Sequence, residues 1–241
     1  MHTICEKKRI VNKIISVFYP PNTICIACGA LRVDDARQLC AQCAKDLRPR
    51  TPPFCPRCGK SGWSMECPDC SLLAPDALES RRAAFLYQGT ARRLVQALKY
   101  DCVSAAARAL AGGMAEVLQE KSVDAIVPVP LHWIRQKQRG FNQAELLGDA
   151  LSALTGIPVR NALTRNRATP SQTTLTKEGR AANVKAAFTL NLPVDGLSIL
   201  LIDDVLTTGS MANACAETLK AAGVAKVAMI AAAQAGIGED E

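Results

Sequence analysis

The spacing of apolar and polar residues predicts an α/β protein over most of the chain. Residues 199–202 are four branched apolar residues in a row, which is typical of a strand buried on both faces. The alanine-rich run 211–222 that follows has the length and composition of a helix. Comparable apolar runs predict further strands at residues 84–87, 125–130, 187–190 and 225–233.

Helical spacing is found in three further segments between these strands. Two amphipathic helices, broken near Asp101, are predicted by Leu94, Leu98, Ala105, Leu110 and Val117. Residues 141–155 predict another helix, which Gly156 and Pro158 end, whereas 131–140 is expected to be a loop or first turn. Because strands and helices alternate, we expect a parallel sheet with flanking helices over residues 84–241.

Polar residues gather where the strand at 199–202 is expected to end. Asp203 and Asp204 come first, and hydroxyl groups and a glycine follow at the expected helix start. A helix start offers unpaired N–H groups to a phosphate, and Gly209 lets the backbone come close. The two carboxylates would repel phosphate and suit ribose hydroxyls. The stretch predicts a ribose 5-phosphate site; the alternative is a helix cap with two solvated aspartates. Its residues are Asp203, Asp204, Val205, Leu206, Thr207, Thr208, Gly209 and Ser210.

Two basic segments could complete an anion site beside this stretch. The loop at 131–140 carries Arg135, Lys137 and Arg139, which could supply charge to a pyrophosphate. A solvated basic turn is the alternative. Residues 160–185 are also basic and contain a polar loop, so this segment is a candidate lid. Lys99, at the break between the first two helices, is interpreted as a surface charge.

Eight cysteines in four pairs precede the α/β part. They follow the patterns C-x2-C-x11-C-x2-C and C-x2-C-x8-C-x2-C. Tetrahedral zinc needs four ligands, so the pairs predict two structural zinc sites in a double zinc ribbon at 23–72. Sequential pairing is favoured, and an interleaved cross-brace is the alternative. Because few large apolar residues lie between the pairs, zinc is expected to hold the region folded, at roughly 10–16 kcal/mol per site. The ligands are Cys25, Cys28, Cys40, Cys43, Cys55, Cys58, Cys67 and Cys70.

Composition narrows the class of protein and its ligands. A net charge of +7 favours anionic ligands, while 4% aromatic residues argues against base stacking as the main way of binding nucleic acid. Residues 1–22 are expected to form a helix without signal-peptide features, and no apolar run is long enough to span a membrane. We therefore expect a reduced, cytoplasmic protein without membrane insertion, in which 73–83 links the ribbons to the α/β domain.

The central stretch resembles the signature that type I phosphoribosyltransferases use for 5-phosphoribosyl 1-pyrophosphate (PRPP). The whole chain resembles the ComF family, also called competence protein F. The matching pieces, besides the cysteines and the central stretch, are Leu98-Lys99-Tyr100, Pro128 to Leu131, Arg139-Gly-Phe-Asn-Gln143, and Gln172 with Arg180. Two departures are Met211, where the signature usually has threonine, and Asp101, where the family often has glycine.

This resemblance implies a double zinc ribbon ahead of a type I phosphoribosyltransferase-like domain that binds PRPP with Mg²⁺. It implies a role in DNA uptake during natural transformation, with a helicase-like DNA translocase as partner. Asp203 and Asp204 would be the catalytic carboxylates. Pyrophosphate and lid contacts would come from Pro130, Leu131, Arg135, Arg139, Asn142, Gln143, Gln172 and Arg180.

An enzyme of this kind would displace pyrophosphate from C1 of PRPP, with carboxylates near the developing positive charge on the ribose and Mg²⁺ and arginine near the leaving group. No stretch indicates the acceptor. Two non-catalytic alternatives stay open: a PRPP- or nucleotide-sensing module whose ribbons dock DNA or a protein, and a protein whose basic lid grips single-stranded DNA.

Overall fold

The computed structural model describes residues 23–31, 36–71, 77–101, 104–118, 122–165 and 187–235. The expected N-terminal helix at 1–22 lies outside the described residues. So does most of the candidate lid, including Gln172 and Arg180.

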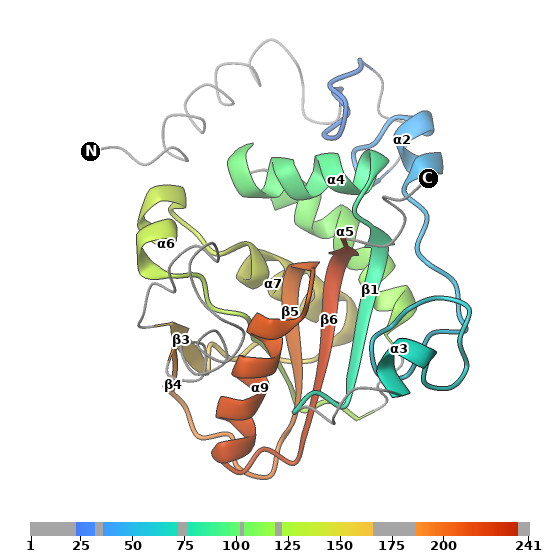
Figure 1. The fold of residues 1–241 in the computed structure, drawn as a ribbon. Helices are drawn as coiled ribbons and strands as arrows, with labels where there is room; N and C mark the ends of the chain where they lie inside the picture. Colours follow the sequence, from blue (N-terminus) through green and yellow to red (C-terminus); the bar gives the residue numbers. More distant parts are fainter. Residues whose placement is uncertain are drawn as a thin grey trace, which may run out of the picture.

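A four-stranded parallel sheet forms the centre of the α/β part (Figure 1). Its strands lie in the order β1 (Ser80–Leu86), β6 (Lys226–Gln234), β5 (Ser198–Leu206) and β2 (Ala125–Pro128). Each neighbouring pair is parallel. The parallel sheet expected from the apolar runs is therefore confirmed. The strands of such a sheet are apolar throughout because helices cover both faces.

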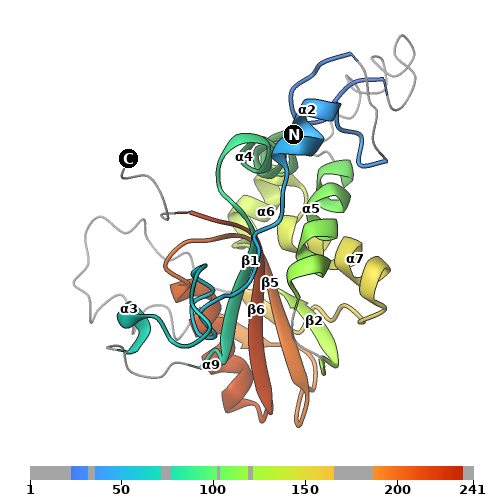
Figure 2. The same ribbon diagram turned by 90° about the vertical axis from the view of Figure 1, so that its right-hand side faces the viewer.

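Helices cover the two faces of the sheet unequally (Figure 2). The α9 helix (Ser210–Ala221) packs on one face, where Ile199 and Leu201 point. Leu200 and Ile202 point to the other face. That face is covered by α4 (Gly89–Gln96), α5 (Ser104–Val117) and α7 (Gln143–Thr155).

Three elements differ from the sequence-based expectation. A π-helical turn, η1 (Ala97–Asp101), continues α4 directly. The segment expected as a loop or first turn forms the short helix α6 (Trp133–Arg139), which the side chain of His132 caps. The strand β4 (Phe188–Leu190) was expected, but it pairs antiparallel with β3 (Leu163–Arg165) in a separate small sheet.

Two strands of the main sheet are longer than their apolar runs. β1 begins at Ser80, four residues before the expected start, since its pairing with β6 begins there, and Arg82 is buried in spite of its charge. Its guanidinium donates to the carbonyl oxygens of Cys55 and Pro56. β5 continues through both aspartates to Leu206, since its pairing with β6 extends that far.

The cysteine-rich segment wraps the outer edge of β1. It contains the short helices α2 (Ala41–Asp46) and α3 (Pro68–Ser71). The backbone N–H of Arg50 donates to the carbonyl of Ala84 in β1 at 2.7 Å. The Arg50 guanidinium donates to the Gln234 side chain in β6 at 2.6 Å. This segment is therefore joined to the sheet as well as folded around its cysteines.

The glycine pair in α5 tests how tightly that helix packs on the sheet. A Cβ atom at Gly113 would lie 2.3 Å from the buried Phe85 ring, whereas one at Gly112 would meet no described heavy atom within 4 Å. We expect Gly113→Ala to lower the free energy of unfolding by about 1–3 kcal/mol through overpacking. Gly112→Ala should raise it by about 0.5–1 kcal/mol, because alanine favours a helix. Urea unfolding of both variants measures the contrast, and equal effects would contradict this packing.

Candidate phosphoribosyl and zinc sites

The predicted phosphate loop lies at the carboxyl end of β5. Gly209 has the left-handed φ of 74° and occupies the N-cap position of α9. A Cβ atom there would lie 2.9 Å from Nε of Arg81, so the turn requires glycine in both conformation and space. The exposed hydroxyls of Thr208 and Ser210 lie 2.8 Å apart, and the Ser210 N–H donates to the Thr208 hydroxyl. Hydroxyl and N–H donors thus surround one helix start, as an anion requires.

Asp204 forms an ion pair that the sequence did not reveal. Nζ of Lys99 lies 3.0 Å from its Oδ1, and the two side chains are only 20% and 13% exposed. The interpretation of Lys99 as a surface charge is therefore wrong. Its place in a π-helical turn brings it to Asp204 near the carboxyl end of β5, and such turns are frequent at functional sites. The Leu98-Lys99-Tyr100 triplet was the available signal.

Asp203 is half-buried beside this pair. Burial and the charge of Asp204 raise the pKa of its carboxyl to about 7, although the Asp204 N–H and Lys99 act in the opposite direction. That N–H donates to Oδ1 of Asp203 at 2.7 Å. Burial, followed by the charge of Asp203, raises the pKa of the Cys215 thiol. The two neighbouring carboxyls thus differ: Asp204 is paired with the Lys99 ammonium, and Asp203 has a pKa close to neutrality.

The raised pKa of Asp203 makes stability depend on pH. Its carboxyl has an ordinary pKa of 3.8 and one of about 7 in the folded protein, so the folded state binds this proton more tightly. The stabilising contribution is complete below about pH 4 and is lost as the pH rises through about 7. We expect Asp203→Asn, which stays neutral, to lose less stability than the wild type between about pH 5 and about pH 8.5. Urea unfolding at both pH values measures this, and parallel profiles would contradict the raised pKa.

The loop and helix after β2 lie at the same edge, because the N–H of Val129 donates to the carbonyl of Ile202. Pro130 and Leu131 are partly exposed there, and Arg135 projects from the exposed surface of α6. Burial and the charge of Arg135 lower the pKa of Arg165 on β3. Two guanidinium groups therefore act on each other near the sheet edge. Arg165 was not singled out among the basic residues of 160–185, since only the fold brings it close to Arg135.

The expected pyrophosphate residues Arg139, Asn142 and Gln143 make internal contacts in this structure. The Asn142 side chain accepts from the Ala144 N–H, which caps α7, and donates to the Val129 carbonyl. Nη1 of Arg139 donates to Oε1 of Gln143 at 3.0 Å. Asn142 and Gln143 are both buried. These contacts hold the turn between α6 and α7 against the end of β2. Arg139, Asn142 and Gln143 therefore support the edge of the candidate site through internal contacts.

The eight paired cysteines form two clusters in sequential order. In each cluster the four sulfur atoms lie within 4.8 Å of one another: Cys25, Cys28, Cys40 and Cys43 in the first, Cys55, Cys58, Cys67 and Cys70 in the second. Zinc at 2.3 Å from four tetrahedral sulfurs separates them by about 3.8 Å. The Cys28–Cys40 and Cys58–Cys67 sulfur distances are 3.8 and 3.7 Å. Both clusters therefore fit a structural zinc ion, and sequential pairing is confirmed over the interleaved alternative.

Backbone N–H groups favour the thiolate form of one cysteine in each cluster. Burial raises the pKa of Cys25, but N–H groups of Cys40, Ala27 and Cys28 outweigh it and lower the value to about 7. Burial also raises the pKa of Cys55, but the N–H groups of Cys58, Cys67 and Arg57 outweigh it and lower the value to about 6. Thiolate is the form that zinc binds, so Cys25 and Cys55 suit the metal chemically as well as geometrically. Burial raises the pKa of Cys43 and Cys70 in the same clusters, so these thiols lose their protons only as the metal binds.

Three comparisons place the chain among known proteins. The double zinc ribbon domain family matches residues 14–71. The chain is 37% identical to the DNA utilization protein YhgH of Salmonella typhi over 199 residues, which is 78% of this chain and 87% of that protein. It is 31% identical to Competence protein F of Haemophilus influenzae over 227 residues, 86% and 94% of the two chains.

Solved structures match about half of the chain at lower identity. A glutamine PRPP amidotransferase from B. subtilis matches 53% of this chain and 26% of its own, with a TM-score of 0.39 and 18% identity. An adenine phosphoribosyltransferase from Thermoanaerobacter pseudethanolicus matches 56% and 83%, with a TM-score of 0.36 and 16% identity. Within the described ranges, no helix has both the length and the apolar character that crossing a membrane takes. From the identity and coverage of its relatives, the chain belongs to the ComF family of competence proteins.

Proposed function

We propose that the protein binds PRPP, or a related ribose 5-phosphate ligand, at the carboxyl edge of its sheet. The observation that carries this proposal is the closeness of two acidic side chains near the end of β5 to the start of α9, with Gly209 in the left-handed conformation in the short turn between them. The N–H and hydroxyl groups of Thr208 to Ser210 suit the 5-phosphate, and Asp203 and Asp204 suit the ribose hydroxyls.

The pyrophosphate of PRPP would lie toward α6 and β3. Arg135 and Arg165 act on each other electrostatically there, and an anion placed between two guanidinium groups removes their mutual repulsion. Mg²⁺ would accompany the pyrophosphate oxygens. The candidate lid residues Gln172 and Arg180 belong to this proposal on resemblance alone.

The reaction that suits such a site is substitution at C1 of the ribose. A nucleophilic acceptor forms the new bond to C1, and pyrophosphate leaves with the electrons of the C1–O bond. The carboxylates would favour the positive charge that develops on the ribose, and the arginines would favour the leaving group. The names of the relatives, competence protein and DNA utilization protein, support a role in handling incoming DNA. A cytoplasmic location and a DNA translocase as partner belong to this proposal on the family resemblance alone.

Binding of single-stranded DNA is a second candidate function, favoured by the surface of α6 and η1. Trp133 is 58% exposed and Tyr100 is 56% exposed. The Arg139 guanidinium lies over the Tyr100 ring at 5.5 Å, and every residue of α6, including Arg135 and Lys137, is at least partly exposed. Exposed rings among cations are what single strands stack on.

Titration calorimetry of the zinc-loaded protein separates the two functions. PRPP with Mg²⁺ should bind and release heat, and release of pyrophosphate during incubation would establish turnover. Binding of PRPP without pyrophosphate release, in incubations that include nucleobases as candidate acceptors, would favour a sensing role. Failure to bind PRPP, together with salt-sensitive binding of an oligothymidylate that Trp133→Ala weakens, would leave the second function and reject the first.

A further inference from the structure

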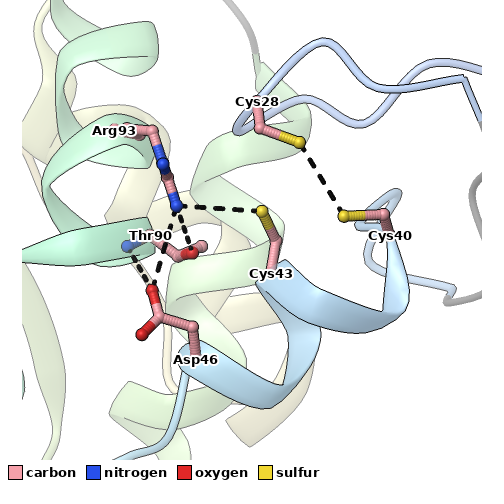
Figure 3. Close-up of polar contacts among 6 residues, drawn as sticks. All are labelled: Cys28, Cys40, Cys43, Asp46, Thr90 and Arg93. Carbon is pink, nitrogen blue, oxygen red and sulfur yellow. Dashed lines mark hydrogen bonds and ion pairs between the residues drawn. The ribbon is translucent and has the colours of Figure 1, made fainter.

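The first zinc ribbon caps the helix α4 (Figure 3). Oδ2 of Asp46, at the end of α2, accepts a hydrogen bond of 2.7 Å from the backbone N–H of Thr90. Within the described part of the chain, Gln88 at the N-cap of α4 makes no side-chain cap of its own. A Cβ atom at Gly89 would lie 2.6 Å from the same Asp46 oxygen, so glycine admits the carboxylate. The helix start thus depends on a residue of the ribbon.

Arg93 joins the same helix to the cysteine cluster (Figure 3). Its Nη2 donates to the Thr90 hydroxyl at 3.0 Å and to Sγ of Cys43 at 3.9 Å. It also lies 3.9 Å from Oδ2 of Asp46. These side chains are about half exposed, so the ion pair contributes little energy. The contact matters for geometry, because Thr90 on the first turn of α4 and Cys43 of the cluster both accept from Arg93.

α4 carries this attachment to the phosphoribosyl edge. The helix runs without interruption into η1, which holds Lys99. Leu94, Val95 and Leu98 are fully buried along α4 and η1, so this continuous helix cannot slide or rotate without disturbing the core. Its far end is fixed by the pair of Lys99 with Asp204 at 3.0 Å. The ribbon and Asp204 therefore hold opposite ends of one rigid element.

We propose that the first zinc ribbon positions Lys99, and through it Asp204, so that zinc in the Cys25–Cys43 cluster strengthens ligand binding at Asp203 to Ser210. This inference rests on the proposed function. Lys99 is a positioning residue here: its ion pair with Oδ1 orients the Asp204 carboxylate and leaves the other carboxylate oxygen to a ribose hydroxyl. Zinc folds the ribbon, the ribbon caps α4, and α4 sets where the Lys99 ammonium lies.

A double-mutant cycle tests this coupling in the zinc-loaded protein. Asp46→Ala should raise the Kd for PRPP about tenfold, although the residue is remote from the ligand. Lys99→Met should also raise it, and the double variant should match Lys99→Met within about twofold, because both changes act through the same contact. Asp124→Ala is the matched control. It removes a carboxylate that accepts 2.8 Å from the Ser198 N–H at the opposite end of β5, and should leave the Kd unchanged. A wild-type Kd in Asp46→Ala, or additive effects in the double variant, would overturn the proposal.

Hydrogen exchange tests the same coupling without PRPP. The Lys99 and Tyr100 amides should exchange faster in Asp46→Ala, and in wild type after zinc is chelated, than in Asp124→Ala or the loaded wild type. If the wild type binds no PRPP, the proposed function fails, and this exchange pattern still decides the positioning of Lys99. Equal exchange in all four samples would overturn it.

Discussion

Asp204→Asn is expected to weaken binding of PRPP with Mg²⁺ by tenfold or more. The amide keeps the shape of the side chain but loses the negative charge, so a charge-assisted hydrogen bond to ribose becomes a neutral one. It also leaves the Lys99 ammonium, 3.0 Å away and largely buried, without its counter-charge. Both losses act at one edge of the sheet. Titration calorimetry of the zinc-loaded variant measures the change in Kd.

Asp124→Asn is the isosteric control for this result, because it makes the same chemical change at the opposite end of β5. Its Kd should equal that of the wild type. The melting temperature of each variant shows whether folding is retained. An Asp204→Asn protein that folds and binds PRPP as tightly as the wild type would remove this carboxylate from the ribose site.

Cys55→Ser is expected to reduce the bound zinc from two ions to one per chain and to unfold the second ribbon. Cys55 is fully buried in a cluster whose other apolar cover is small: Cys58 and Trp63 are the partly buried residues packed on it. Since a structural zinc site contributes about 10–16 kcal/mol of apparent binding, this cluster has little else to keep it folded. Metal analysis of the purified variant and limited proteolysis within 53–71 measure both effects.

Cys215→Ala provides the matched control, because it removes a fully buried thiol of α9 that belongs to neither cluster. It should retain two zinc ions and resist proteolysis in the ribbon. Retention of both ions by Cys55→Ser would contradict the assignment of this cysteine as a ligand.

The first ribbon should survive loss of its metal better than the second. Leu39, Leu47 and two of its cysteines are buried in the same apolar cluster as α4 and α5. The sequence suggested that zinc alone would hold the whole cysteine-rich segment, since few large apolar residues lie between the pairs. In the first ribbon those few apolar residues pack against apolar residues of the α/β part. The sequence of the cysteine-rich segment alone does not show this packing.

The parts of the fold that were predictable are those that local sequence encodes. Four branched residues before two aspartates specify a buried strand, and C-x2-C spacing specifies a metal knuckle. The sequential assignment of Cys25 to Cys43 and of Cys55 to Cys70 followed from chain proximity. Asp203 to Ser210 form one continuous stretch, so their arrangement as strand, turn and helix start could be expected before the fold was known.

The parts that were missed depend on contacts between distant residues. Lys99 has the pattern of an exposed lysine on an amphipathic helix, and only the crossing of η1 over the end of β5 gives it Asp204 as a partner. The first residues of β1 were missed because Arg82 is charged. Its guanidinium is buried against carbonyl groups of the second ribbon, which lie far away in the sequence. Asn142 and Gln143 carry side chains suited to a ligand, yet the turn between α6 and α7 uses them.

The bond between Arg50 and Ala84 has a consequence for the behaviour of metal-free protein. β1 is an outer strand of the sheet, and an uncovered outer strand recruits another chain through its open N–H and C=O groups. The segment between the two ribbons occupies that edge, and we expect it to leave the edge when the ribbons lose their metal. Chelation should therefore increase self-association through β1, so zinc would protect the sheet from aggregation as well as hold the ribbons folded.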